Sequence, residues 1–519
     1  MEEDDARLVR FLTLLALLVV LPVIGTIAGA ASGYKLLAVL GGVALALSLG
    51  LVLAIWLAGL IARTNRVVLV ATFAPLLVLT NLALVPLIAI NGFIAAVAVG
   101  FIFPIAGGLM GLGALIGVVV MLNRSLSLPF ARSGVGAVRG VALTRDAQPR
   151  VWQAVDDLAA RIRTTAPQHI VVGLDPGFFV TQGRTTCIEP AEIAPSTDGT
   201  PDSADSAGAA AEQGAGTASG VLRSNTAQWD RAFGGDDDAD DEDRAARRRK
   251  KKGKKGEDDE VREEVVAGVT LRLRPLRGRL LYVSLPFCRI MSAGELRAIV
   301  AHELGHYRGR DLRFSAAFYP IYHGAIVSLR QLGAEAGGGI SGWPLLPAFY
   351  LLAFLIESFA EAEARLSRTR ELAADRVSVE ATDQQTTASA LVKIHGFHRY
   401  WRRALATLRD RIRAAEQGLN ASADFAAVAQ EERESPWMRR DLDQEEPPHP
   451  IDSHPPLSRR LAAVQSSIQD VAEHAFTVQP AEPAIALFED PEPLERRLTL
   501  VEKAIMVENR EAIEGSRAY

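Results

Sequence analysis

The sequence is poor in the residues that define several large classes of protein. Only two cysteines, Cys187 and Cys288, occur in 519 residues, so a secreted fold held together by disulfide bonds is excluded. Aromatic residues make up 6% of the chain, and the formal net charge is -5, whereas a dedicated nucleic-acid-binding protein is expected to be basic. We therefore expect no nucleic-acid partner.

Charged residues are also absent from most of the N-terminal part of the chain. The uncharged stretches cover residues 11–34, 36–62 and 67–123. About 20 apolar residues cross a bilayer as a helix, so the first two stretches predict one span each and the third is long enough for two. The turn dipeptide Asn91-Gly92 lies near the middle of the third stretch and divides it into spans 67–90 and 93–122. The sequence thus predicts a four-helix transmembrane region over residues 1–123.

The first span is predicted to be retained rather than removed as a signal peptide. The segment before it is acidic, and its apolar stretch is longer than the roughly 7–15 residues of a signal peptide. One side of the predicted spans has the arginines Arg7, Arg10, Arg63, Arg66, Arg124 and Arg132, and the other side has only Lys35. Positive residues favour the cytoplasmic side. We therefore expect an integral multi-pass protein, in the inner membrane of a bacterial cell, with the large C-terminal part in the cytoplasm.

Two segments of the C-terminal part have too few large apolar residues to build a core. Residues 190–260 are rich in small and polar residues and contain a run of acids followed by a run of bases, which predicts a disordered charged insertion. The basic run could bind anionic lipid or act as a nuclear signal, although a solvated insertion explains it without a partner. Residues 417–450 are polar and proline-rich, which predicts a linker. These breaks leave residues 124–189, 261–416 and 451–519 as the folded parts.

Local patterns predict a helix and three strands in these folded parts. Residues 149–165 have the apolar spacing of an amphipathic helix, and residues 169–173 form a short apolar run typical of a strand. Residues 266–274 and 279–285 predict two further strands, joined by a turn at Pro275.

A metal-binding pattern follows the last of these strands. Ser292 and Glu295 have the spacing of a capping box, which predicts the start of a helix. That helix contains His302-Glu303-Leu-Gly-His306, in which the two imidazoles lie at i and i+4 on one face and can bind one metal ion. Glu303 lies about 100° around the helix from His302. Its carboxylate is thus expected beside the metal, where it can take a proton from a water molecule.

A catalytic zinc site needs a third protein ligand. The pattern with a third histidine six residues after His306 fails, because Leu312 occupies that position. A later helix instead has Glu371 and Asp375 at i and i+4 on a single face. Glu371 can complete a His-His-Glu set, and Asp375 can accept a hydrogen bond from a ligating imidazole. The histidine motif is short enough to occur by chance, and this second pair of residues favours metal binding.

Three blocks of the sequence resemble the HtpX-like and CaaX prenyl-protease family of membrane zinc metalloendopeptidases. They are residues 295–306, 367–375 and 453–460, the last of which reads Ser-His-Pro-Pro-Leu-Ser-Arg-Arg. The resemblance implies one zinc ion per chain held by His302, His306 and Glu371, with Glu303 as the catalytic base. It also implies that His454 supports the active site by stabilising the oxyanion, although a His-Pro-Pro sequence could equally be the entry to a helix.

Two apolar stretches, residues 314–329 and 343–359, separate the two ligand sets. Both sets must meet at one metal ion, so either both stretches cross the membrane as a hairpin or neither does. Prolines within them weaken a full span, and we expect a membrane-associated helical hairpin. In zinc peptidases of this kind an edge strand beside the metal pairs with an extended substrate, and residues 279–285 are the expected strand here.

These patterns together predict a mainly α-helical protein with polytopic transmembrane helices and a cytoplasmic zincin-like (gluzincin) α+β domain containing a small β-sheet. The expected activity is hydrolysis of peptide bonds. The expected partners are protein or peptide substrates, chiefly membrane or misfolded proteins, and the lipid bilayer. Processing of lipidated or other specific membrane substrates is an alternative with the same chemistry. A zinc-binding scaffold without turnover is another alternative, and the intact Glu303 argues against it. A channel or transporter is disfavoured because the predicted spans have no ionisable residue.

Overall fold

The computed structural model describes residues 18–127, 136–191, 261–308, 311–337, 342–435 and 454–516. The predicted charged insertion, residues 190–260, lies almost entirely outside the described residues. The chain divides into two compact units. The first comprises residues 1–134, 313–371 and 448–455, and the second comprises residues 135–312, 372–447 and 456–519. Helix α10 (Leu346–Ala381) is continuous and contributes to both.

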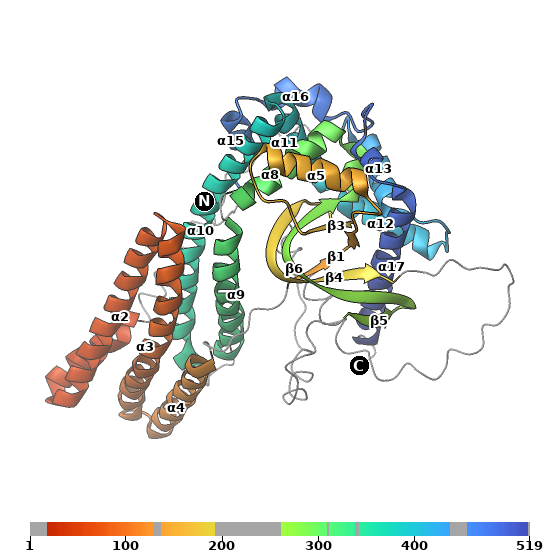
Figure 1. Ribbon diagram of the computed structural model, residues 1–519. Coiled ribbons are helices and arrows are strands. Elements are labelled where there is room, and N and C mark those ends of the chain that lie inside the picture. The colour runs from red at the N-terminus through yellow and green to blue at the C-terminus, as the bar shows by residue number, and fades with distance from the viewer. Residues whose placement is uncertain are drawn as a thin grey trace. The chain divides into compact units, whose positions relative to one another are not determined.

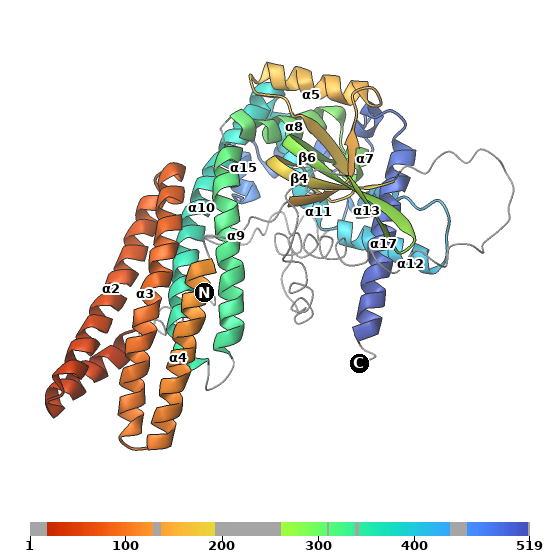
Figure 2. The same cartoon turned by 60° about the horizontal axis from the view of Figure 1, so that its bottom comes forward.

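The first unit is built from long apolar helices (Figure 1; Figure 2). It contains a helix over Leu18–Ser32, α2 (Lys35–Ala62), α3 (Arg66–Gly100), α4 (Pro104–Ser127), α9 (Asp311–Ala336), the short 3-10 helix η5 (Trp343–Leu345) and the first part of α10. Four helices of the described chain are long and apolar enough to cross a membrane: Lys35–Ala62, Arg66–Gly100, Pro104–Asn123 and Trp343–Ala381. The prediction of a mainly helical protein with several membrane helices is therefore confirmed.

The predicted division of the third apolar stretch at Asn91-Gly92 is wrong. Both residues lie inside α3, and the chain turns at residues 101–103, immediately before Pro104 begins α4. Gly92 serves packing rather than a turn, because a Cβ atom built on it would lie 2.1 Å from the Cβ atom of Ala114 on α4. Close contact between small residues is typical of helices that pack in a membrane.

Helices α9 and α10 form the hairpin expected from the two later apolar stretches, and they pack against the N-terminal helices of the same unit. The ring of Phe73 on α3 lies 5.4 Å from that of Phe318 on α9 and 5.0 Å from that of Phe359 on α10. Arg63, directly after α2, forms an ion pair with Glu361 of α10 at 2.8 Å. The hairpin is thus an integral part of the helical unit.

The second unit combines a small mixed sheet with the remaining helices (Figure 1). The strands are β1 (Gly136–Arg139), β2 (Val141–Leu143), β3 (His169–Gly173), β4 (Phe179–Pro190), β5 (Arg262–Val266) and β6 (Val269–Ser284). Their order is β1-β4-β6-β3-β2, and β5 also pairs with β6. The helices are α5 (Pro149–Arg161), α7 (Leu285–Ile290), α8 (Ala293–Arg308), α11 (Gln384–His398), α12 (Trp401–Arg413), α13 (Ala421–Glu432), α15 (Leu457–Ala463), α16 (Ile468–Ala475), the 3-10 helix η6 (Ala484–Leu487) and α17 (Pro491–Ser516). The helix and strand predicted at 149–165 and 169–173 are confirmed as α5 and β3.

The sheet supports helix α8, which carries the two histidines. Ile170 of β3 and Leu281 of β6 share a buried apolar core with Leu304 of α8. Near the end of α8, the hydroxyl of Tyr307 donates a hydrogen bond of 2.9 Å to the carbonyl oxygen of Leu280 on β6. The C-terminal end of α8 is therefore fixed to the sheet by both apolar and polar contacts.

The two strands predicted over residues 266–274 and 279–285 form one continuous strand, β6, which passes through Pro275. The hairpin turn lies earlier, at Ala267-Gly268, where the φ angles are 45° and 77°. Within the described sheet, β5 and β3 pair with β6 on either side of Pro275 but not at it. On the other side of β6, Thr186 of β4 lies opposite Pro275. A proline has no N–H to donate, so it is tolerated where a strand has a described partner on one side only.

The edge-strand prediction for residues 279–285 is also wrong. This part of β6 lies between β4 and β3, so strands flank it on both sides. Among the described strands, a free edge lies instead on β4, because residues 180–183 pair only with β6 and β1 joins β4 from Thr185 onwards. Sheet order depends on contacts between distant parts of the chain, which the local apolar pattern does not encode.

The predicted linker over residues 417–450 contains a folded helix, α13. Asn420 caps this helix by accepting a hydrogen bond from the N–H of Ala423 at 3.1 Å. Phe425 and Ala429 are fully buried in the main core of the second unit. The segment is polar on average, but α13 has a narrow apolar face, which the prediction of a linker missed. The rest of the predicted linker, from residue 436, lies outside the described residues.

The capping box predicted at the start of α8 is present. The N–H of Glu295 donates to Ser292 Oγ at 3.1 Å, and the N–H of Ser292 donates to Glu295 Oε2 at 2.8 Å. Glu295 also accepts hydrogen bonds from Ser389 at 2.6 Å and Lys393 at 2.7 Å, both on α11. Lys393 is 1% exposed and donates further to two backbone carbonyl oxygens. A buried ion pair thus ties the N-terminus of α8 to α11.

We expect Lys393→Met to lower the free energy of unfolding by about 3 kcal/mol, because the Glu295 carboxylate would remain buried without its cationic partner. Urea unfolding of the full chain in detergent, followed by tryptophan fluorescence, measures the change. Lys503→Met is the control, since Lys503 is exposed on α17, and its effect should stay within about 0.5 kcal/mol. Equal stability of the two variants would contradict the role of the buried pair.

Candidate metal centre

Helix α8 presents His302 and His306 on one face, one turn apart. Their ring centroids are 5.1 Å apart, and the ring planes are nearly perpendicular, at 89°. The two residues are only 5% and 9% exposed. The helical spacing predicted from the sequence therefore produces two neighbouring imidazoles in a largely water-excluded position.

Glu371 on α10 completes a group of three metal-binding side chains. It is 5% exposed, and the ligand atoms of His302, His306 and Glu371 all lie within 4.8 Å of one another. Two imidazoles and one carboxylate are a ligand set of catalytic zinc sites, in which the fourth position is left for water or substrate. In the described part of the chain, this is the one such group of histidine, cysteine or acidic side chains. The donor set therefore fits a zinc ion.

Gly305, between the two histidines, allows α8 and α10 to approach closely. A Cβ atom built on Gly305 would lie 3.4 Å from the Cα atom of Ala374 and 3.4 Å from the Cβ atom of Val377. A Cβ atom would be in ordinary van der Waals contact at these distances, so a side chain larger than alanine would push the two helices apart. The glycine of the motif thus contributes to the geometry of the group although it has no ligand atom.

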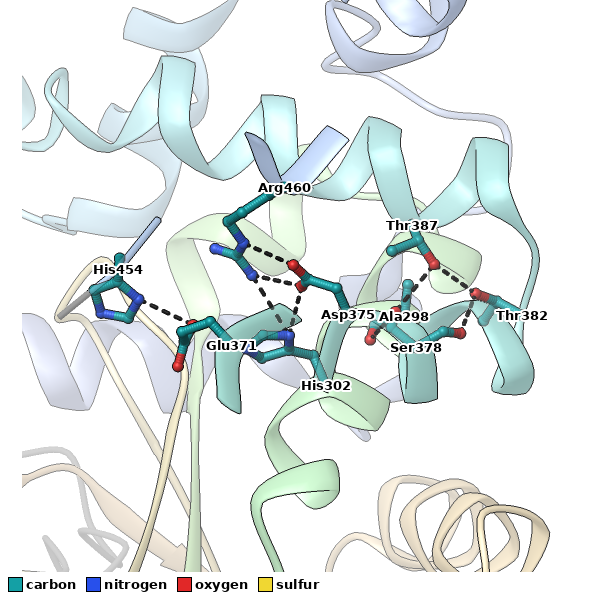
Figure 3. A network of polar contacts seen from close by, with 9 residues as sticks. All are labelled: Ala298, His302, Glu371, Asp375, Ser378, Thr382, Thr387, His454 and Arg460. Carbon is teal, nitrogen blue, oxygen red and sulfur yellow. Dashed lines mark hydrogen bonds and ion pairs between the residues drawn. The ribbon is translucent and has the colours of Figure 1, made fainter. Parts of the chain in front are cut away.

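Asp375 lies next to His302, one turn along α10 from Glu371 (Figure 3). Its Oδ1 atom is 2.9 Å from His302 Nδ1, and its side chain is fully buried. Hydrogen bonds with His302 and with Arg460 occupy both oxygens of this buried carboxylate. We assign the Nδ1 proton to His302, because a charged carboxylate only accepts hydrogen bonds. This tautomer leaves Nε2 available to a metal.

Arg460 is a residue of the site that the motifs did not reveal. It lies on α15 and makes a bidentate pair with Asp375, with Nε to Oδ2 at 3.0 Å and Nη2 to Oδ1 at 2.7 Å. Its side chain is 16% exposed. The only sequence signal was its place at the end of the block 453–460, and a buried carboxylate such as Asp375 requires a cationic partner of this kind.

His454 contacts the third ligand of the group. Its Nδ1 atom lies 3.0 Å from Oε2 of Glu371, and its side chain is 59% exposed. Figure 3 shows the imidazole of His454 directed at this carboxylate. Glu303, which follows His302 in α8, is partly buried. The structure therefore brings together His302, His306, Glu371, Asp375 and His454, and it adds Arg460 to them.

Comparisons with known proteins agree with this geometry. The family model described as Peptidase family M48 matches residues 275–468, which include all the residues of the group described above. A protein named Protease HtpX homolog from Methylibium petroleiphilum is 37% identical over 113 residues, which cover 21% of this chain and 40% of that protein. A protein of the same name from Archaeoglobus fulgidus is 28% identical over 208 residues, which cover 37% of this chain and 57% of that protein.

The chain thus covers between 40% and 57% of the length of these two relatives. No solved structure matches it. The matched family model and the His-His-Glu group nevertheless point to the same part of the chain and the same chemistry. Residues 275–468 of this protein thus resemble peptidase family M48, a family of zinc metallopeptidases.

Proposed function

We propose that this protein is a membrane-anchored zinc metalloendopeptidase. The observation that carries the proposal is the buried group of His302, His306 and Glu371, with Glu303 directly after the first of them. These three side chains would hold one zinc ion per chain. When bound, zinc supplies a Lewis acid that polarises the scissile carbonyl and makes water more acidic.

Glu303 is proposed as the group that moves the proton. Its carboxylate takes a proton from the attacking water as the water oxygen forms a bond to the carbonyl carbon of the peptide. The proton then passes to the peptide nitrogen as the C–N bond breaks, which releases a carboxylic acid and an amine. Water is the only co-reactant, and Glu303 returns to its starting charge.

Asp375 and Arg460 are proposed to hold His302 ready for metal binding. The hydrogen bond from His302 to Asp375 fixes the tautomer and the orientation of the ring. The bidentate pair with Arg460 holds Asp375 in place and balances its charge. Because Arg460 donates two hydrogen bonds to the Asp375 carboxylate, this carboxylate is a weaker acceptor for the Nδ1 proton of His302. The carboxylate therefore orients the ligand without taking its proton.

His454 is proposed to support the active site. Its imidazole contacts the ligand Glu371, and more than half of its side chain is exposed, so it can also reach a bound substrate. A histidine in this position can donate a hydrogen bond to the oxyanion that forms when water adds to the carbonyl. The alternative, that His-Pro-Pro only begins helix α15, does not account for the contact with Glu371.

We infer that the substrate binds along the free edge of β4. Residues 180–183 of β4 pair with β6 on one side, and no described strand pairs with the other. Thr181 pairs with Leu280, whose carbonyl oxygen accepts the hydrogen bond from Tyr307, the residue after the ligand His306. The free edge is therefore close to the end of α8. An extended peptide can pair with such an edge through its backbone, which favours broad specificity.

The cell membrane of a bacterium is the proposed location, with the catalytic unit in the cytoplasm. The four candidate membrane helices support a multi-pass protein. Arg63 directly follows α2 and Arg66 begins α3, and an excess of such residues marks the cytoplasmic side. Because the catalytic unit is part of a chain with membrane helices, it meets membrane proteins at a high local concentration. Membrane or misfolded proteins are therefore the proposed substrates, and processing of a lipidated substrate would use the same residues.

Replacement of Glu303 tests the proposed chemistry. In the purified full chain in detergent with zinc, Glu303→Gln should lower the rate of cleavage of an unfolded test protein by about 10²- to 10⁴-fold, because the general base is lost. Its zinc content should equal that of the wild type, since the ligands remain. Glu380→Gln, at an exposed position of α10, is the control and should cleave normally. Equal cleavage by all three proteins would rule out the mechanism, and zinc binding without any cleavage would favour a scaffold.

Replacement of Asp375 tests the support of His302. Asp375→Asn should raise the zinc dissociation constant by about 10- to 100-fold, because the amide no longer fixes the imidazole tautomer. The dissociation constant can be measured by competition with a coloured chelator. Asp410→Asn, at an exposed position of α12, is the control and should bind zinc as the wild type does. An unchanged constant for Asp375→Asn would show that the hydrogen bond does not contribute.

If the substrate backbone pairs with β4, N-methylation of successive substrate amides should lower cleavage at every second position. In a set of peptides that each have one N-methylated amide near the cleaved bond, alternate positions should lose cleavage efficiency. An extended strand directs every second N–H towards its partner, and the methyl group removes that donor. The ratio kcat/KM for each peptide measures the effect. A uniform effect, or none, would contradict binding along a strand edge.

A further inference from the structure

Helices α8 and α10 meet at three successive levels, the second and third of which are drawn in Figure 3. At the first level, Glu371 lies near His306 and His302. The second level pairs His302 with Asp375, and the third pairs Ala298 with Ser378. The first level is part of the metal group, and the second is the hydrogen bond that orients His302. At the third level, Ser378 Oγ donates a hydrogen bond of 2.7 Å to the carbonyl oxygen of Ala298.

The third level is almost completely enclosed. Ser378 is 1% exposed and Thr387, at the start of α11, is 2% exposed. Ser378 has one hydroxyl proton and donates it to Ala298, so its oxygen accepts the hydrogen bond from Thr387 at 3.0 Å. Thr382 lies 3.2 Å from Thr387 and donates to the carbonyl oxygen of Ser378 at 2.9 Å. The hydroxyl groups of Ser378 and Thr387 therefore connect the end of α10 and the start of α11 to one carbonyl of α8, and Thr382 donates to the backbone of Ser378.

This carbonyl is linked directly to the first metal ligand. In an α-helix the carbonyl of residue i accepts the N–H of residue i+4, so Ala298 and His302 share a backbone hydrogen bond. On α10, Ser378 lies at i+7 from Glu371, which is two turns further along the same face. Both helices are rigid over these distances. A shift of α10 against α8 at Ser378 would therefore move Glu371 relative to the histidines by a similar amount.

We propose that Ser378, supported by Thr387, is a positioning residue that sets the register of α10 against α8 and so fixes Glu371 at ligand distance. The proposal rests on the proposed function, because the metal belongs to that function. The apolar contact of Gly305 with Ala374 lets the helices approach but tolerates sliding along their axes. The hydrogen bond to Ala298 is directional, and it resists such sliding even before a metal binds.

Zinc affinity and the spectrum of the cobalt-substituted protein test this role apart from activity. In the full chain in detergent, Ser378→Ala should raise the zinc dissociation constant by about tenfold and change the visible absorption bands of bound Co²⁺. Thr387→Val keeps the volume of the side chain and should change both quantities in the same direction, by a smaller amount. Thr499→Val is the matched control, because Thr499 on α17 is 1% exposed and its hydroxyl donates to the carbonyl oxygen of Glu495 at 2.8 Å. It should bind both metals as the wild type does.

Wild-type zinc affinity and an unchanged cobalt spectrum in Ser378→Ala and Thr387→Val would overturn the proposal. If Ser378→Ala does not fold, the comparison of Thr387→Val with Thr499→Val decides in the same way. Failure of the proposed function gives a different result, because the wild type would then bind zinc but show no cleavage that depends on Glu303. The zinc dissociation constants of Ser378→Ala, Thr387→Val and Thr499→Val would still decide the role of Ser378. A wild type that binds no zinc would overturn both.

Discussion

The contact between α8 and α10 is the constraint on which the candidate metal centre depends. Helix α8 alone provides two imidazoles, and the third ligand, Glu371, comes from a helix much later in the chain. Gly305 allows the two helices to approach, and the hydrogen bond between Ser378 and Ala298 fixes how far one helix lies along the other. The metal group therefore results from helix packing rather than from a single motif.

Two buried ion pairs hold helix α8 in position. Asp375 is fully buried between His302 and Arg460, and both residues donate hydrogen bonds to its carboxylate. At the other end of α8, Lys393 and Glu295 form a second buried pair that secures the first turn of the helix. In a medium of low dielectric constant, such pairs are costly to break once they have formed. Both ends of α8 and its ligand face are thus held in one position.

The sequence predicts those parts of this arrangement that depend on local spacing. His302 and His306, the capping box at Ser292 and the pair Glu371 and Asp375 all follow from the period of the α-helix. Arg460 and Ser378 do not, because each acts on a residue from a distant segment and has no recognisable spacing of its own.

The same limit explains the errors in the predicted fold. Local turn signals at Asn91-Gly92 and Pro275 are overridden by tertiary contacts: Gly92 packs against a neighbouring helix, and Pro275 lies where β6 lacks a partner strand on one side among the described residues.

The most direct test of this account is X-ray absorption at the zinc edge of the purified full chain, together with its metal content. The account predicts one zinc ion per chain, nitrogen and oxygen ligands at about 2.0–2.2 Å, and the scattering pattern of two imidazoles. The signal should be lost when His302 and His306 are both replaced by alanine. Sulfur ligands at about 2.3 Å, or zinc that remains after both histidines are replaced, would show that the metal is held elsewhere and would contradict the account.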